Sequence, residues 1–186
     1  SDVYKRQIWE GRDWIEERCR VGRNAVCSPE LVMRTSVQRQ IGEYRAELPH
    51  SADMEMWLRA ATVTGVGRIE GADQAFYRVH SGSLSHTLCV TPTDDLRARH
   101  DAFASVLTGP SAVHGADGLY RQARCALADA ALRQASDGYV TLAADEVDEL
   151  QAFALEMFPA ASETAGWLEL QRRRSVAATV PSGSGA

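Results

Sequence analysis

From Thr91 onward, apolar residues recur every three or four positions, which is the spacing that places them on one face of an α-helix. One such stripe consists of Val147, Leu150, Phe153, Ala154 and Met157. Glycine or proline follows three of the four periodic segments, and both residues commonly end helices. The pattern predicts four packed helices over residues 91–175, followed by a flexible tail over residues 176–186.

The ends of these helices carry further signals. The first is expected to run from a cap at Thr93 or Asp94 to about Leu107. The last carries Trp167 and Leu168 as apolar contacts and ends in three arginines, 172–174, a charge that suits a helix C-terminus.

Residues 8–90 show a mixed pattern. Residues 9–19 and 35–42 predict short helices, the second capped by Thr35 or Ser36. Residues 25–34 are rich in residues that favour strands, and residues 68–80 read as an extended segment. Between them, one helical stripe consists of Met54, Trp57, Leu58 and Ala61.

Length and charge limit the class of protein. A chain of 186 residues is the size of one ordinary domain. Its net charge of −5 argues against a general nucleic-acid binder or a binder of anionic membranes. No apolar run approaches the roughly 20 residues that span a bilayer. The four cysteines lack CxxC spacing, which indicates reduced thiols in a cytoplasmic protein.

Residues 1–7 need a separate interpretation. The stretch DVYKRQ is what a common sequencing adapter gives when it is translated, and Lys5 is the only lysine in the chain. We therefore treat residues 1–7 as a leader without function. On this interpretation the natural sequence starts near Ile8, and the protein is a fragment.

One ordered set of residues resembles a known family. The stretch HSADMEMWLRAA, a glycine break and then GRIEGADQAFYRVHSGSLS are similar to the C-terminal half of family 2 glycosyltransferases. The matching residues are Asp53, Glu55, Trp57, Leu58, Arg59, Tyr77, Arg78, His80 and Ser85. The resemblance covers about residues 20–87. It implies an α/β fold, with residues 8–90 as the C-terminal part of a GT-A domain and residues 91–175 as a helical extension.

The resemblance also implies roles for single residues. Asp53 stands in the first turn of a predicted helix and would be the general base that takes the proton of an acceptor hydroxyl. Arg78, His80 and Ser83 would bind the nucleoside diphosphate of a nucleotide-sugar donor, and His80 is also the candidate metal ligand. Asn24 and Arg34 are candidates for the pocket of an acceptor, whose identity stays open.

The chain departs from the family pattern in several places. The acidic residue that often precedes the aspartate is Ala52 here. The family's Asp-x-Asp motif, which would hold a divalent metal (Mg or Mn), is missing from this sequence. No Gln-x-x-Arg-Trp segment follows either, which argues against a processive polysaccharide synthase. The expected location is the cytoplasm, free or peripheral at the membrane.

A second interpretation comes from a different class of protein. The chain could be a non-catalytic helical interaction domain, in which the helices beyond Thr91 bind a partner and Asp53 only caps its helix. The reading frame upstream of Ile8 would distinguish the two, because a nucleotide-binding strand and an Asp-x-Asp motif there would favour the enzyme.

Overall fold

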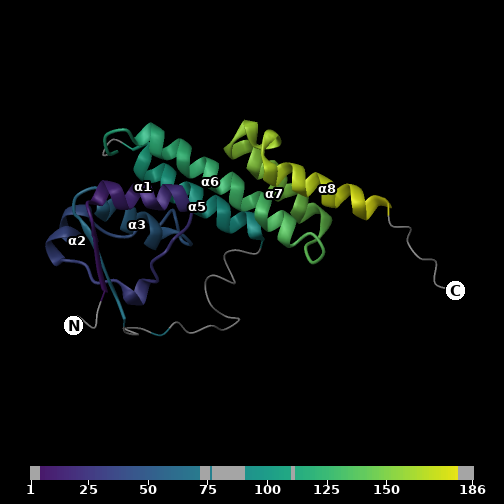
Figure 1. The fold of residues 1–186 in the computed structure, drawn as a ribbon. Coiled ribbons are helices and arrows are strands. Elements are labelled where there is room, and N and C mark those ends of the chain that lie inside the picture. The colour runs from purple at the N-terminus through teal and green to yellow at the C-terminus, as the bar shows by residue number, and fades with distance from the viewer. Residues whose placement is uncertain (1–4, 72–75, 77–90, 110–111, 180–186) are drawn as a thin grey trace.

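The computed structural model describes residues 5–71, 76, 91–109 and 112–179 (Figure 1). The described residues form seven α-helices, two 3-10 helices and one two-stranded antiparallel sheet. In chain order the elements are β1 (Lys5–Trp9), α1 (Gly11–Val21), η1 (Ser28–Glu30), α2 (Thr35–Ile41), α3 (Ala52–Ala61), β2 (Val66–Glu70), α5 (Pro92–Leu107), α6 (Ala116–Asp137), α7 (Ala144–Met157), η2 (Pro159–Glu163) and α8 (Ala165–Thr179).

The predicted α/β fold, with residues 8–90 as part of a GT-A domain, is wrong. A GT-A domain is built on a sheet of several strands, whereas the described residues contain only the β1–β2 pair and are otherwise mostly helical. The strand expected in residues 25–34 is absent from the described structure. Pro29 stands in η1 instead, and Val32 is 98 % exposed. Proline cannot donate a ladder hydrogen bond, and a strand needs a partner beside it.

The single sheet is a surface ribbon. Its register runs from Lys5 opposite Glu70 to Trp9 opposite Val66. Ile8 and Ile69 are 81 % and 55 % exposed, so the ribbon does not form the centre of a core. Part of β1 falls within residues 1–7, whose interpretation as a translated adapter stays a prediction.

The helix α1 packs closely against α3 and α6. Trp14, Ile15 and Cys19 are buried on its inner face, and burial raises the pKa of the Cys19 thiol to about 12. Gly11 begins the helix where a Cβ atom would lie 1.9 Å from the carbonyl oxygen of Ala61. Only glycine allows this approach, which fixes the start of α1 on the end of α3.

The helices α5 to α8 lie side by side and form the elongated part of the molecule (Figure 1). The start of α5 was predicted two or three residues late, because Thr91 is the N-cap. Its hydroxyl accepts from the Asp94 N–H at 3.2 Å, and the Asp94 carboxylate accepts from the Thr91 N–H at 2.8 Å. The predicted end at Leu107 and the predicted buried stripe of α7 are confirmed.

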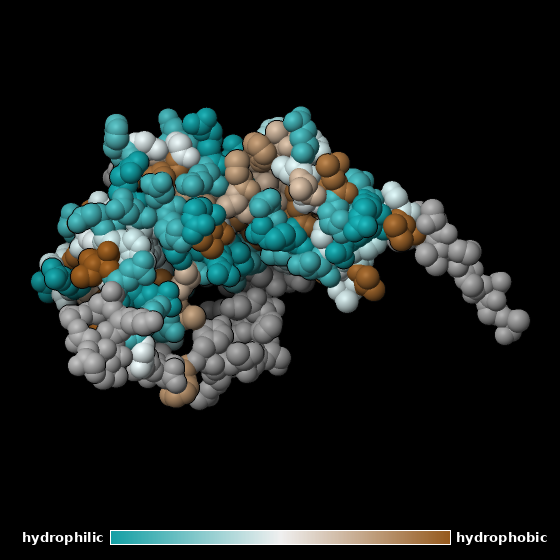
Figure 2. Space-filling view, in the orientation of Figure 1, coloured by the Kyte–Doolittle hydropathy of each residue, from teal (hydrophilic) through white to brown (hydrophobic). Residues whose placement is uncertain are grey.

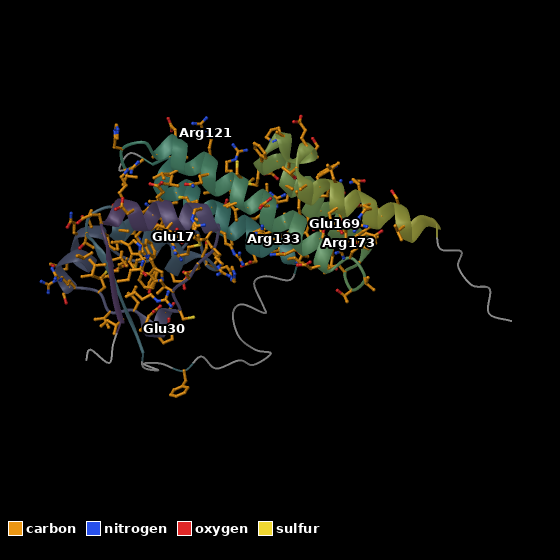
Figure 3. All side chains as sticks on the ribbon, in the orientation of Figure 1. Glu17, Glu30, Arg121, Arg133, Glu169 and Arg173 are labelled. Carbon is orange, nitrogen blue, oxygen red and sulfur yellow. The ribbon has the colours of Figure 1, made fainter. Side chains whose placement is uncertain are left out.

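Arginines of the last helix, α8, bind the neighbouring helices. Arg173 donates to the Ser136 carbonyl at 3.0 Å, and Arg174 pairs with Asp148 at 2.6 Å, so α8 is linked to α6 and α7. Glu169 binds both Arg172 and Arg173, and these hydrogen bonds lower the pKa of its carboxyl to about 2 (Figure 3). The arginine run is therefore more than a solvated helix end.

One hydrophobic core connects all these helices. It extends from α1 and α3 through α6 to α7 and α8. The N-terminal helices and the C-terminal helices therefore pack around the same core. The surface in Figure 2 is mostly hydrophilic, with separate apolar patches. Within the described residues, no helix has both the length and the hydropathy needed to cross a membrane.

Candidate functional site

Asp53 lies in the first turn of α3, as predicted, and is half-buried. Its Oδ1 accepts a hydrogen bond of 2.6 Å from the Met54 N–H, one of the backbone donors that are left free at a helix N-terminus. Ser51 occupies the N-cap position, but its side chain makes no capping hydrogen bond, and its buried Oγ has no partner among the described residues. The Asp53 side chain, rather than Ser51, therefore accepts a hydrogen bond from a free backbone N–H at the start of α3.

Two residues from the loop after α1 converge on the Asp53 carboxylate. Asn24 Nδ2 donates to Oδ1 at 3.3 Å, and Ser28 Oγ donates to Oδ2 at 3.0 Å. The loop can turn back because Gly22 ends α1 with a φ of 68°, a conformation that suits glycine. Asn24 is held in turn, because its Oδ1 accepts from the Val26 N–H at 3.1 Å. The carboxylate is thus oriented by three donors.

The two carboxylate oxygens differ in their surroundings. Oδ1 binds the Met54 N–H and the half-buried Asn24 amide, which fix it in place. In the described residues Oδ2 binds only Ser28, whose side chain is exposed. A hydroxyl group from outside could therefore replace Ser28 at Oδ2 without disturbing the helix.

A buried ion network begins two residues further along α3. Glu55 is fully buried, and it accepts from Arg59 Nη2 at 2.8 Å and from Arg45 Nε at 2.9 Å. Arg59 also donates to the carbonyls of Ile41 and Glu43. These bonds attach the segment between α2 and α3 to the same helix that carries Asp53.

The start of α3 is also attached to the helical region. His50 Nε2 lies 3.2 Å from Asp95 Oδ1 on α5, and Asp95 pairs with Arg99 one turn later. Tyr44 packs edge-on against Trp57, with ring centroids 6.2 Å apart. Asp53 therefore stands on a helix that is fixed from both sides.

The predicted site residues are only partly brought together. Asn24 contacts Asp53, which agrees with their expected place in one site. Arg34 stands exposed at the N-cap position of α2, and its side chain makes no hydrogen bond or ion pair with any described residue. Arg78, His80 and Ser83 lie outside the described residues. Their expected roles at a donor diphosphate stay predictions.

Two residues were not predicted from the sequence: Ser28, and Arg45 as a partner of Glu55. Ser28 falls in the segment that was expected to be a strand, and no periodic pattern distinguishes it. The signal that could have found it is Ser-Pro, a pair that favours a turn in which the serine hydroxyl is free to reach a neighbouring element.

The metal implied by the resemblance has no site among the described residues. No group of three or more His, Cys, Asp or Glu side chains there could hold an ion. Asp53 already uses its oxygens for protein hydrogen bonds, and Glu55 uses its own for two arginines. The described residues therefore do not fit a divalent metal.

Comparisons with protein-family models, with curated proteins and with solved structures found no match to this chain.

Proposed function

We propose that this chain is the acceptor-side part of an inverting glycosyltransferase, which transfers a sugar from a nucleotide-sugar donor to an acceptor hydroxyl. The observation that carries the proposal is the Asp53 carboxylate. Asn24 and Met54 orient it at a helix N-terminus, and within the described part of the chain its Oδ2 binds only the exposed hydroxyl of Ser28. Function depends on the site rather than on the fold class, so the proposal does not need a GT-A sheet in this chain.

In the proposed mechanism the acceptor hydroxyl takes the place of Ser28 Oγ and donates to Asp53 Oδ2. As the acceptor oxygen attacks the anomeric carbon, its proton moves to Oδ2. The bond from the anomeric carbon to the donor phosphate breaks, and the nucleoside diphosphate leaves with the bonding electrons. Attack from the face opposite the leaving group inverts the anomeric centre.

Three further predicted site residues would bind the nucleotide-sugar donor. Arg78, His80 and Ser83 would stabilise the charge that develops on the diphosphate. We also propose a cytoplasmic location, which the free thiols of Cys19, Cys27 and Cys125 support because reduced cysteines are usual there.

Asp53→Asn tests the base. Asparagine caps helices about as well as aspartate, so the fold should persist. Without the proton acceptor, release of nucleoside diphosphate from a nucleotide sugar should fall about 10²–10⁴-fold in the complete enzyme, with donor binding nearly unchanged. His80→Ala should instead weaken donor binding.

The matched control is Asp117→Asn, which removes another carboxylate from the first turn of a helix, α6. It should leave the rate unchanged. An Asp53→Asn enzyme that transfers sugar at the wild-type rate would refute the role of Asp53, which would then be only a helix cap.

A helical interaction domain is the second candidate, and one observation favours it. Leu168 and Val176 on α8 are 61 % and 59 % exposed, and apolar surface is visible beside the C-terminal tail (Figure 2). Leu168→Glu distinguishes the two proposals. It should abolish partner binding if α8 is an interaction surface and leave sugar transfer unchanged if Asp53 is the functional centre.

A further inference from the structure

One guanidinium group of α1 is largely shielded and has no carboxylate of its own. The Arg18 side chain is 14 % exposed, and its shielded Nε atom has no hydrogen-bond partner among the residues that the structure describes. Its ion-pair partner in the described part of the chain is Glu17, at 3.7 Å. Arg20 binds the same carboxylate through two shorter hydrogen bonds, of 2.9 and 2.7 Å. Since arginine does not lose its proton in proteins, this buried cation has only a shared counter-charge.

The position of this group is fixed by an aromatic ring. The Arg18 guanidinium carbon lies 5.5 Å from the centroid of the Trp14 ring, a cation–π contact. The Trp14 side chain is itself buried between α1 and the core. An arginine held in this way loses little conformational entropy when it binds an anion, because its side chain is already ordered.

Three other arginines act on Arg18 through their charge. Arg23 follows the end of α1, and its exposed side chain makes no hydrogen bond or ion pair with any described residue. Arg68 projects from β2, 64 % exposed, and pairs with Glu70. Burial lowers the pKa of Arg18, and the positive charges of Arg23, Arg20 and Arg68 lower it further. Glu17 and Glu70 are the two carboxylates that pair with these four arginines, so the cluster keeps an excess of positive charge.

We propose that Arg18, Arg23 and Arg68 form a binding site for a phosphate-bearing group. Guanidinium groups bind phosphate oxygens through paired hydrogen bonds, and the excess positive charge suits a doubly charged anion. Arg23 directly precedes Asn24, whose amide holds Asp53. The phosphate would therefore belong to a substrate that reaches Asp53. This assignment to a substrate rests on the proposed function, whereas the phosphate binding itself does not.

The test uses the 186-residue chain and inorganic pyrophosphate, titrated by calorimetry at constant ionic strength. Arg18→Gln and Arg23→Gln should each weaken binding about tenfold, which is the loss of one charge-assisted pair of hydrogen bonds. The matched control is Arg121→Gln on α6 (Figure 3), which removes another exposed arginine without a described partner and should have no effect. Arg23 is exposed, so its replacement should not disturb folding.

Two results would overturn the site. In the first, the wild type and Arg23→Gln bind pyrophosphate with equal affinity, or neither of them binds it. The other is an equal loss in Arg121→Gln, because binding would then follow total charge only. Asp53→Asn should bind pyrophosphate normally. If that variant also transfers sugar normally, the proposed function fails while the phosphate site stands.

Two further titrations identify the source of the phosphate. A nucleoside diphosphate that binds more tightly than pyrophosphate, with the same dependence on Arg23, indicates the donor. Binding to phosphatidylcholine vesicles that contain phosphatidic acid, lost in Arg23→Gln, indicates a lipid-linked substrate.

Discussion

Replacing Glu55 with glutamine should destabilise the protein more than any exposed charge change. The Glu55 side chain is fully buried, and Arg59, only 17 % exposed, binds both of its oxygens. Glutamine would place an NH₂ group against guanidinium donors and would remove the counter-charge. Breaking a buried ion pair by removing one partner costs about 3–5 kcal/mol. Arg45 adds little to this loss, because it is 43 % exposed and water can replace its partner.

Thermal unfolding followed by circular dichroism measures the effect. For a chain of this size about 1 kcal/mol corresponds to roughly 2–4 °C, so Tm should fall by about 6–20 °C. Glu47→Gln is the control, since Glu47 pairs with the same Arg45 but is 66 % exposed, and a change within about 0.5 kcal/mol is expected. The double variant Glu55→Gln/Arg59→Gln should lose less than the sum of the single losses. A loss below about 1 kcal/mol for Glu55→Gln would show that the network contributes little to the stability of the fold.

Two further predictions concern the packing of α1 and the charge of α8. Gly11→Ala should cost about 1–3 kcal/mol in urea unfolding, because its Cβ would clash with the Ala61 carbonyl, whereas Gly118→Ala, with open space around it, should stabilise α6 slightly. Equal stabilities of the two variants would contradict the close contact between α1 and α3. The Glu169 carboxyl should titrate at about 2 in NMR, against an ordinary 4.5, and Arg172→Gln should raise that midpoint. Since this pKa is lowered by folding, the contribution of Glu169 to stability is complete above about 4.5 and is lost as the pH falls toward 2. A midpoint near 4.5 in the wild type would mean that the contacts with Arg172 and Arg173 do not persist in solution.

The helices could be predicted from the sequence because their signals are local. The α7 stripe follows a 3.6-residue period, and all of its predicted positions are buried. The 3.6-residue period predicts buried positions less well where only a narrow face of a helix packs against its neighbours. In α8 the sequence offers two nearby leucines, of which Leu168 is 61 % exposed and Leu170 is fully buried. Which of two neighbouring apolar residues faces inward depends on the helices beside it.

Strands and contacts between distant residues were harder to predict. Residues 25–34 have the composition of a strand, but strand formation requires a partner, and Pro29 favours the turn that forms there. Asp53 and Asn24 were assigned to one site from the family resemblance, and the structure brings them within hydrogen-bond distance. Ser28 and the Arg45–Glu55 pair were missed because such pairs, 25 and 10 residues apart, leave no periodic signal in the sequence.

The place of α6 in the fold has a consequence for the order of folding. Its contacts with α5 and α7 join neighbours in the chain, whereas its contact with α1 joins distant parts of the sequence. Beside that contact, Arg12 on α1 donates to the carbonyl of His114, which lies 102 residues away and just before α6. The chain entropy lost on closing a loop grows with its length, so contacts between neighbours form sooner. We expect α5 to α8 to assemble first and α1 to dock later, bringing Asn24 to Asp53. In hydrogen exchange, the amides of α6 should therefore outlast those at the start of α3.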